Sequence, residues 1–432
     1  MQRFWPSVGG AELLSLEICR RLAAAGHSVT VATTNALDFE YFWDQRARAL
    51  DRPAREVVHG LEVLRFPVRH LPASRLAFPA VRRLTSLLST VPIVPSPALE
   101  HLAHLTPLVP ALQQWLSGDP GTFDIVAGMS SICFESLLLP GQRFARRRGI
   151  PFVICPLTHL GIGDPRKDRV GRYYTMRHQL ELIRRSDAVI ALTEREAQFY
   201  AGQGVPTARI VVRAPGVDPV GLAGGDGERF RAKYRVDEPI VFFIGAMAHD
   251  KGVFHLVAAM RRLWAKGIPA RLVLAGAVLE PMRRFWLGLP RECQQRILLL
   301  DSVSEADKLD LLAAGDVFAM PSRTDAFGIV YLEAWSYAKP VIGAVAGGVP
   351  EVIRHEQDGL LVPFADVPAL ADSIERLLRD RALAHFLGER GRIKVLAEYT
   401  WDKTFAVVNR LYMDLTGNNG SAASTASTPV ST

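Results

Sequence analysis

Short apolar runs alternate with segments of helical period from one end of this 432-residue chain to the other. In the first half the apolar runs are residues 27–34, 123–129, 151–160, 187–193 and 209–216. This alternation is typical of parallel sheets whose strands are joined by crossover helices. The near-continuous apolarity of the runs predicts strands buried on both faces. We therefore expect an α/β protein built from doubly wound sheets.

A second series of the same kind follows a stretch rich in glycine and charged residues. Its expected strands are residues 240–245, 271–276, 297–303, 316–322 and 340–344. A chain of this length is too long for one ordinary hydrophobic core, and two such series fit two domains.

The domain boundaries follow from these series and from the composition between them. We expect a first domain over 1–218, a linker over 219–239, a second domain over 240–398, a terminal helix over 399–416 and a tail over 417–432. The tail is almost free of apolar residues, which predicts disorder.

The first series lacks an expected element at its beginning. The first strand of a doubly wound sheet lies in the middle and precedes the first glycine turn, yet only MQRFWPS precedes VGGAE at residues 8–12. A start upstream of Met1 would supply that strand and is the explanation we expect. The alternative is a sheet closed around a gap, with unpaired strand edges.

The composition limits the class of protein. Hydrophobic residues make up 49% of the chain and charged residues 22%, which fits full globular cores. The net charge of +7 is compatible with phosphorylated ligands, anionic membranes or nucleic acid, and does not choose among them. Four scattered cysteines without a CxxC pair indicate neither a disulfide framework nor a zinc site.

The cysteine pattern also favours a reducing compartment. No stretch approaches the roughly 18 apolar residues of a membrane helix, and the N-terminus shows no signal-peptide pattern. We therefore expect a cytoplasmic protein, either free or peripheral at the inner face of the plasma membrane.

Residues 324–335 read TDAFGIVYLEAW and place two carboxylates around an expected helix start. Asp325 lies in the loop and Glu333 is expected about two turns into the helix. If all eight residues were helical, the two would be displaced by about 12 Å along the axis. Carboxyl pairs in glycoside hydrolases lie roughly 5 to 9.5 Å apart, so a shared acid/base site is disfavoured.

The same loop offers the backbone N–H groups of Phe327, Gly328 and Ile329 at a helix N-terminus, which suits a phosphate. A sugar nucleotide would fit, with its sugar at Asp325, its diphosphate at the amides and its ribose at Glu333. On local spacing alone, a capping Asp and a solvated helical Glu explain the pattern better.

Two neighbouring loops favour the ligand hypothesis. Lys251 follows the expected strand 240–245, where a cation reaches a diphosphate bound above the carboxyl ends of a sheet. Gly347 and Gly348 follow the expected strand 340–344 and let backbone approach a ligand closely. Three loops at one edge of one sheet would then converge.

These motifs resemble the retaining glycosyltransferases of family 4, the glycosyl transferases group 1, which have the GT-B architecture of two Rossmann-like domains facing a cleft. The family's Glu, seven residues, Glu signature falls on Asp325 and Glu333. The resemblance runs through GVD (216–218), DKG (250–252), PSRTDAFGIVYLEAWSYAKPVIG (321–343), GGVPEVI (347–353), DGLLV (358–362) and YTWDKTFAVVNRLY (399–412), with GGAE (9–12), THLG (158–161) and SDAVIALTEREAQFY (186–200) in the first half.

The resemblance implies a donor-binding second domain, an acceptor-side first domain and a terminal helix that crosses back to the first domain. It implies transfer from a UDP- or GDP-sugar with retained configuration and no metal or other cofactor. The acceptor would be a carbohydrate, a lipid-linked glycan or a small molecule, most simply in cell-surface polysaccharide or glycolipid synthesis, and no nucleic acid partner is expected. No residue is an obvious covalent nucleophile, so departure and attack on the same sugar face are expected, with domain closure excluding water.

The family's functional residues carry over by position. His159, Asp325 and Lys251 would be catalytic: His159 would face the acceptor and the transferred sugar, Asp325 would orient that sugar, and Lys251 would neutralise the leaving diphosphate. The implied donor-binding set is Gly9, Gly10, Lys251, Asp325, Ala326, Phe327, Gly328, Ile329, Glu333, Gly347 and Gly348. Without the family match, a strand-to-helix turn at Gly9 and a structural His159 would be the simpler explanations.

The sequence departs from the family at two positions. Ala246 stands where the family usually has an arginine beside the glycine that follows 240–244, so phosphate binding depends more on Lys251 or on an arginine from elsewhere. Asp325 replaces the first glutamate of the signature and shortens its reach by one methylene. Either departure would change donor preference or activity.

Basic residues cluster in the later part of the first domain: Arg143, Arg146, Arg147, Arg148, Arg166, Lys167, Arg169, Arg172, Arg177, Arg184 and Arg185. They would dock an anionic bilayer or a phosphate-bearing lipid acceptor, or they are solvated helix faces.

Other classes of protein stay under consideration. A Rossmann-type NAD oxidoreductase lacks its fingerprint, because no GxGxxG stands between a strand and a helix with an acid about 20 residues on. A catalytically silent sugar-nucleotide-binding protein, an inverting GT-B transferase and an epimerase are the alternatives.

Overall fold

In the computed structural model, which describes residues 1–7 and 9–417, the second half of the chain forms one parallel six-stranded sheet. Its strands are β8 (Ile240–Ile244), β9 (Arg271–Ala275), β10 (Ile297–Leu300), β11 (Val317–Ala319), β12 (Val341–Ala344) and β13 (Leu360–Val362). All residues of β8 are buried, as expected for a strand covered on both faces. The five strands predicted in this half are confirmed, and β13 adds a sixth.

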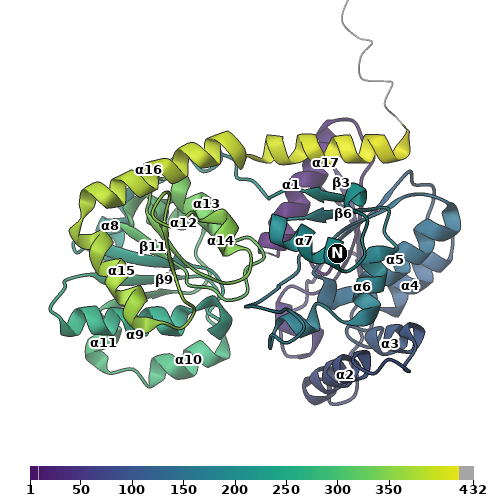
Figure 1. Cartoon of the computed structure of the whole chain (residues 1–432), viewed down its shortest axis with the longest axis horizontal. Helices are drawn as coiled ribbons and strands as arrows, with labels where there is room; N and C mark the ends of the chain where they lie inside the picture. Colours follow the sequence, from purple (N-terminus) through teal and green to yellow (C-terminus); the bar gives the residue numbers. More distant parts are fainter. Residues whose placement is uncertain (8, 418–432) are drawn as a thin grey trace, which may run out of the picture.

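Helices cover both faces of this sheet (Figure 1). They are α8 (Gly227–Tyr234), α9 (Val253–Ala265), α10 (Glu280–Leu287), α11 (Arg291–Gln295), α12 (Glu305–Ala314), α13 (Ile329–Ser336), α14 (Val349–Val352), α15 (Val367–Arg379) and α16 (Arg381–Glu398). The short 3₁₀ turn η5 (His249–Lys251) precedes α9.

The strand order of the second sheet is β10–β9–β8–β11–β12–β13. The chain therefore winds outward in one direction from β8 and in the other direction from β11. Ligands of open α/β sheets bind beyond the carboxyl ends of the strands at such a reversal. The loops after β8 and β11 occupy that place.

The first half contains two sheets where one was expected. A four-stranded parallel sheet consists of β4 (Val126–Met129), β5 (Phe152–Cys155), β6 (Ala188–Ala191) and β7 (Ile210–Val212). The other sheet has the order β1–β3–β2, with β1 (Thr30–Thr34), β2 (Arg55–Val58) and β3 (Leu61–Phe66). The antiparallel hairpin of β2 and β3 was not predicted.

The opening residues lie between the two sheets of this half. The Met1 amino group donates to Ala32 O at 2.8 Å, and the Thr34 hydroxyl donates to Gln2 O at 2.6 Å. On the other side, the Ser130 hydroxyl that follows β4 donates to the Gln2 side chain. These residues therefore bridge the place where the expected first strand is missing from the sequence.

The helices of the first half enclose these sheets (Figure 1). They are α1 (Gly10–Ala24), α2 (Ser74–Ser89), α3 (Ser96–Ala103), α4 (Pro110–Ser117), α5 (Glu135–Arg148), α6 (Arg177–Arg184) and α7 (Glu194–Gly202). The 3₁₀ turns are η1 (Phe39–Phe42), η2 (Ile132–Phe134), η3 (Gly171–Tyr173) and η4 (Thr207–Arg209).

Two segments connect the halves. The predicted linker, 219–239, contains α8, whose Phe230 is buried and whose contacts are with α12 of the second half. The last helix, α17 (Trp401–Thr416), runs on from α16 and packs against α1, where Arg21 Nε lies 3.2 Å from Asp402 Oδ1. Of the predicted tail, 418–432 lie outside the described residues.

Within residues 1–7 and 9–417, no helix combines the length and apolarity needed to cross a bilayer.

Candidate functional site

Three loops of the second sheet meet at the reversal of its strand order. Lys251 follows β8, Asp325 follows β11, and Gly347 and Gly348 follow β12. The Lys251 ammonium lies 2.6 Å from Asp325 Oδ1, and the Gly348 N–H donates to Asp325 O at 2.9 Å. The three loops that the sequence placed at one sheet edge are thus in contact.

Gly347 is required by this contact. Its φ is +58°, and a Cβ at this position would lie 2.3 Å from Asp325 O. Any side chain would therefore force the loops after β11 and β12 apart. The next position is as tight, because a Cβ on Gly348 would overlap Ala326 O.

Asp325 is buried and holds one free acceptor. Its Oδ1 takes the Lys251 hydrogen bond, while Oδ2 has no hydrogen-bond partner among the described residues. Burial raises the pKa of the Asp325 carboxyl, but the Lys251 ammonium and hydrogen bonds outweigh it, so the pKa lies below its ordinary value. The Asp325 carboxyl is therefore ionised, and its Oδ2 is a buried acceptor without a partner among the described residues.

His159 reaches this loop from the first half. It follows β5, and its Nδ1 contacts Thr324 O, next to Asp325. Burial and the nearby Lys251 lower the pKa of His159 from 6.5 to about 4, against an opposing effect of Asp325. The ring is therefore neutral at pH 7. Since a carbonyl only accepts, Nδ1 carries the proton and Nε2 is a free acceptor.

The start of α13 presents unpaired backbone donors. No hydrogen-bond acceptor among the described residues lies opposite the N–H groups of Phe327, Gly328 and Ile329. Gly328 precedes the helix with φ +93°, which L residues rarely adopt. Only the backbone of Phe327 is available, because its buried side chain packs against Tyr399 with ring centroids 5.5 Å apart.

Glu333 lies nearer to the helix start than the sequence indicated. Helix α13 begins at Ile329, so Glu333 is about one turn into it, where two turns were expected. Its Oε1 lies 3.2 Å from Lys308 Nζ. Burial raises the pKa of Glu333, and Lys308 opposes that effect in part. The two carboxylates of the signature thus have separate cationic partners, in agreement with separate roles.

Gly9 and Gly10 lie at the N-terminus of α1. A Cβ on Gly10 would lie 3.7 Å from Ile329 Cδ1, so the first turns of α1 and α13 approach each other across the halves. Gly9 is extended and lies beside the Glu12 carboxylate, which pairs with Arg3 at 3.0 Å. Gly10 therefore lies next to the start of α13, and Gly9 is its neighbour at the N-terminus of α1.

Several residues that join the halves were not singled out from the sequence. The Arg195 guanidinium, at the start of α7, donates to Gly347 O at 2.6 Å and to Gly161 O at 3.3 Å. Arg323 Nη2 lies 2.7 Å from Asp168 Oδ2. Arg323 and Asp168 are 155 residues apart, so no local pattern could have paired them. Arg195 stands inside a quoted motif, which was the available signal.

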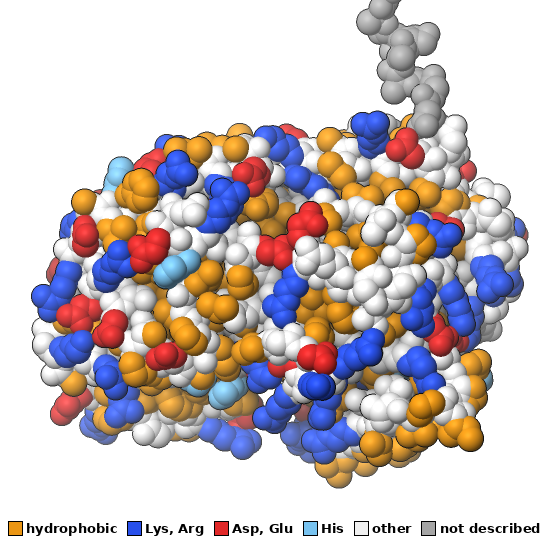
Figure 2. Space-filling model, viewed as in Figure 1, with side chains coloured by type: hydrophobic (Ala, Val, Ile, Leu, Met, Phe, Trp, Pro, Cys, Tyr) orange, Lys and Arg blue, Asp and Glu red, His pale blue; other side chains and the backbone are white. Residues whose placement is uncertain are grey.

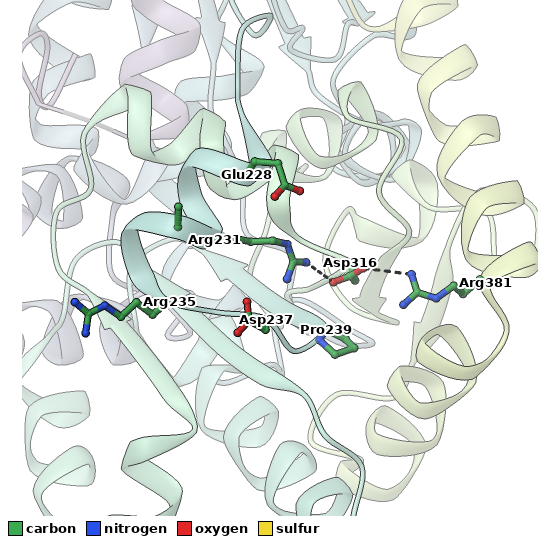
Figure 3. A pocket seen from close by; sticks show the side chains of 8 residues that line it. Glu228, Arg231, Arg235, Asp237, Pro239, Asp316 and Arg381 are labelled. Carbon is green, nitrogen blue, oxygen red and sulfur yellow. Dashed lines mark hydrogen bonds and ion pairs between the residues drawn. The ribbon is translucent and has the colours of Figure 1, made fainter.

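A separate hollow of about 650 Å³ lies at the opposite, amino-terminal ends of β8 and β11 (Figure 3). Arg231 and Arg381 line it and pair with Asp316 at 3.1 and 3.8 Å. Its charges are thus balanced by its own residues, and it is distant from the Lys251 cluster. Within the described ranges, no three His, Cys, Asp or Glu side chains form a cluster suited to a metal ion.

Two family models match consecutive parts of the chain. The model described as "Glycosyl transferase 4-like domain" matches residues 9–216, and "Glycosyl transferases group 1" matches residues 226–394. Every candidate site residue named above falls within one of these ranges.

Curated relatives match over part of their length. The GDP-mannose-dependent alpha-(1-6)-phosphatidylinositol monomannoside mannosyltransferase of Mycobacterium tuberculosis is 31% identical over 231 residues, which is 50% of this chain and 59% of the relative. The D-inositol 3-phosphate glycosyltransferase of Mycobacterium bovis is 32% identical over 238 residues, 52% of this chain and 48% of the relative. The match thus spans about half the length of these relatives.

Solved structures match over nearly the whole chain. Sucrose-phosphate synthase of Thermosynechococcus elongatus superposes with a TM-score of 0.69 at 21% identity, covering 95% of both chains. Anabaena HepE in complex with UDP-glucose gives 0.68 at 18% identity, covering 96% of this chain and 98% of that one. The matched models and the shared fold show that this chain belongs to the glycosyl transferases group 1, family 4, with the GT-B fold.

Proposed function

We propose that the chain is a retaining, metal-independent hexosyltransferase that uses a nucleoside-diphosphate sugar. One observation carries the proposal: Lys251, Asp325 and the unpaired amides of α13 converge at the strand-order reversal of a single sheet. This combination offers a cation and helix-terminal N–H groups to a diphosphate, and a buried carboxylate to a sugar.

The donor would lie along the start of α13. Asp325 Oδ2, which lacks a partner among the described residues, would accept from hydroxyls of the transferred sugar. The diphosphate would take the free amides of 327–329 and the Lys251 ammonium, and Glu333 would accept from ribose hydroxyls. Relatives that use GDP-mannose and a neighbour that holds UDP-glucose make these the first donors to test.

His159 would serve the reacting end of the donor as a neutral acceptor. Its Nε2 would orient a hydroxyl of the transferred sugar or of the acceptor, while negative charge develops on the departing phosphate beside Lys251. Leaving-group departure and acceptor attack on one face would retain the configuration. The names of the relatives point to lipid or inositol acceptors, which fits glycolipid or cell-surface polysaccharide synthesis.

The experiment is a donor screen followed by transfer. Thermal shifts with GDP-mannose, UDP-glucose and other nucleotide sugars would select the donor, and a radiolabelled donor would report hydrolysis or transfer. Glu333→Ala should severely weaken donor binding, and His159→Ala should mainly lower turnover. Unchanged kinetics in both variants would overturn the site, and a product of inverted configuration would overturn the retaining mechanism.

The second candidate is a sugar-nucleotide-binding protein without turnover. The tight Lys251–Asp325 pair favours it, because each charge already has a partner before any ligand binds. Ala246, which stands where the family usually has an arginine, also favours this candidate. A donor that shifts the melting temperature but is neither hydrolysed nor transferred would favour this candidate.

A further inference from the structure

Helix α2 exposes an apolar stripe to solvent. Leu76, Ala80, Leu84 and Leu87 follow one another at four, four and three residues, so they share one face of the helix. The three leucines are 76%, 46% and 64% exposed. Isolated exposed leucines need no explanation, but a continuous stripe on one helix does.

The opposite face of the same helix packs on the first half of the chain. Ser74, Arg82 and Thr85 are its buried residues, and Arg82 Nη1 lies 2.6 Å from Glu135 Oε1. On this face Phe78 is partly buried, with its ring centroid 5.7 Å from that of Trp43. The helix is thus held by an ion pair and by apolar packing, while Leu76, Leu84 and Leu87 are exposed. The exposed leucines are therefore on a different face of α2 from the one that packs on the protein.

The loop after α2 extends the stripe. Val91 is exposed and Ile93 is 89% exposed. The Arg177 guanidinium donates to Pro92 O at 2.9 Å and to Val91 O at 3.2 Å, which fixes this loop against α6. We call Leu76, Ala80, Leu84, Leu87, Val91 and Ile93 the α2 ridge.

Exposed basic residues lie on α2 and in the segment around η3, which contacts α2. Arg83 lies on α2 itself, and Lys167, Arg169 and Arg172 lie within six residues of Tyr173, whose carbonyl accepts from Arg82 at 3.3 Å. All four are exposed, and none has a carboxylate within ion-pair distance among the described residues. Figure 2 shows the apolar lower edge of this lobe beside a group of Lys and Arg side chains.

Two of the other predicted basic residues are paired. Arg143 pairs with Glu100 at 2.6 Å, and Arg148 pairs with Asp119 at 2.7 Å. Arg146 and Arg147 of α5 are exposed, and neither has a carboxylate within ion-pair distance among the described residues. Positive charge available to a partner therefore lies on α5 as well as near the α2 ridge.

We propose that the α2 ridge, with Arg83, Lys167, Arg169 and Arg172, forms a docking surface for an anionic lipid bilayer. The leucines and Ile93 would enter the boundary between headgroups and acyl chains, and the four basic side chains would contact lipid phosphates. A second copy of the chain is a poorer occupant, because a two-fold interface would bring two like-charged surfaces together.

The surface is connected to the candidate site through η3. Its Tyr173 carbonyl accepts from Arg82 of α2, and the ring of the following Tyr174 lies 4.8 Å from that of His159. Docking would therefore place the bilayer on the acceptor-side lobe, from which a lipid-held acceptor reaches His159. This last step rests on the proposed function, whereas docking itself does not.

Flotation of the full chain with phosphatidylcholine vesicles, with and without phosphatidylglycerol, tests the surface. We expect flotation only with the anionic vesicles. The double variant L84Q/L87Q should lower the partition coefficient roughly tenfold or more, and R83Q about fivefold. The matched control is F386Q/I393Q, an exposed apolar pair on α16 of the other lobe, which should partition like the wild type.

Equal flotation of the wild type and L84Q/L87Q, or equal flotation with neutral and anionic vesicles, would overturn the proposal. Sedimentation velocity tests the rival occupant: a wild-type dimer that L84Q/L87Q converts to a monomer would assign the ridge to a second copy. A donor-induced thermal shift, measured on the same samples, stays unchanged in L84Q/L87Q if only docking is lost. Loss of docking with an intact donor-induced shift can thus be told apart from loss of donor binding with intact docking.

Discussion

The two halves of the chain, the first and second lobes, differ in the continuity of their sheets. The second lobe has one parallel sheet of six strands, and its strand-order reversal brings together the loops that hold Lys251, Asp325 and Gly347. The first lobe has two sheets and contributes His159, Arg195 and Asp168 as single side chains that reach across. This difference is why we assign the proposed donor chemistry to the second lobe, with the first lobe adding single contacts from His159, Arg195 and Asp168.

The largest effect should come from removing the cation of the second lobe. Lys251→Met deletes the charge that we propose lies opposite the leaving phosphate, and it leaves the buried Asp325 carboxylate without its partner. We expect kcat/KM to fall about 10²- to 10³-fold, as for loss of one donor to a developing oxyanion. Steady-state kinetics with the identified donor would measure this loss.

Lys266→Met is the matched control, because Lys266 follows the last residue of α9, the helix after Lys251, and pairs at the surface with Glu375 at 2.8 Å. Its kinetics should equal those of the wild type. Equal kinetics in Lys251→Met would contradict the assignment of donor chemistry to the second lobe.

The next effect should separate binding from stability at Glu333. Glu333→Gln keeps the shape of the side chain but loses the charged acceptor that we propose for ribose, so the donor KM should rise roughly tenfold to a hundredfold. Because burial raises the pKa of Glu333, its charged form is disfavoured in the folded protein, and the variant should melt at an equal or higher temperature.

Glu305→Gln provides the comparison. Glu305 also pairs with Lys308, at 2.9 Å, but it is mostly exposed. A raised donor KM in this variant would show that the charge of Lys308, and not the Glu333 carboxylate, is what matters.

The contrast between the lobes also explains what the sequence could predict. In the second lobe, strands such as β8 are uninterrupted apolar runs, and Lys251 and Asp325 lie in the loops after strand ends, so local pattern and topology agree. In the first lobe, β2 and β3 read REVV and LEVLRF, so charged residues interrupt their apolar runs, and they were not recognised. The glycine- and charge-rich 219–239 concealed α8, which is stabilised by the Asp226 cap and by burial of Phe230.

Partners distant in the sequence were beyond any local pattern. Lys308 is 25 residues from Glu333, and Arg323 is 155 residues from Asp168. Each side chain alone is an ordinary surface charge. Their roles depend on how the loops after different strands meet, which spacing within one segment does not specify.

A smaller effect is expected from the tight contact of two loops in the second lobe. Gly347→Ala introduces a Cβ that would lie 2.3 Å from Asp325 O, at φ +58°. We expect a loss of about 2 to 3 kcal/mol in the free energy of unfolding, measured by denaturant titration, together with weaker donor binding.

Gly26→Ala separates the two causes of that loss. Gly26 also has a positive φ, +90°, but a Cβ there meets nothing within 4 Å. It should cost only about 1 kcal/mol through backbone strain and should leave donor binding unchanged. Equal costs at both positions would show that the contact between the loops adds nothing.

The smallest effect concerns the first lobe and its dependence on pH. The pKa of His159 falls from 6.5 to about 4 on folding, so between these values the unfolded chain binds the proton and the folded protein does not. Stability contributed by neutral His159 is therefore complete above pH 6.5 and is lost as the pH falls toward 4. The pKa of His104 is also lowered to about 4, through burial and Arg143, so it contributes in the same window.

Replacing either histidine by Gln should therefore flatten the decrease of the melting temperature between pH 6.5 and 4 by a few degrees. Only His159→Gln should also change the donor-induced shift in melting temperature across this pH range. His159 contacts the loop of Asp325, whereas His104 bonds to Gln113 at 2.9 Å. If His104→Gln changes the donor-induced shift as much as His159→Gln does, the first lobe acts on the site through its overall stability. A change confined to His159→Gln would instead assign its influence to this one side chain.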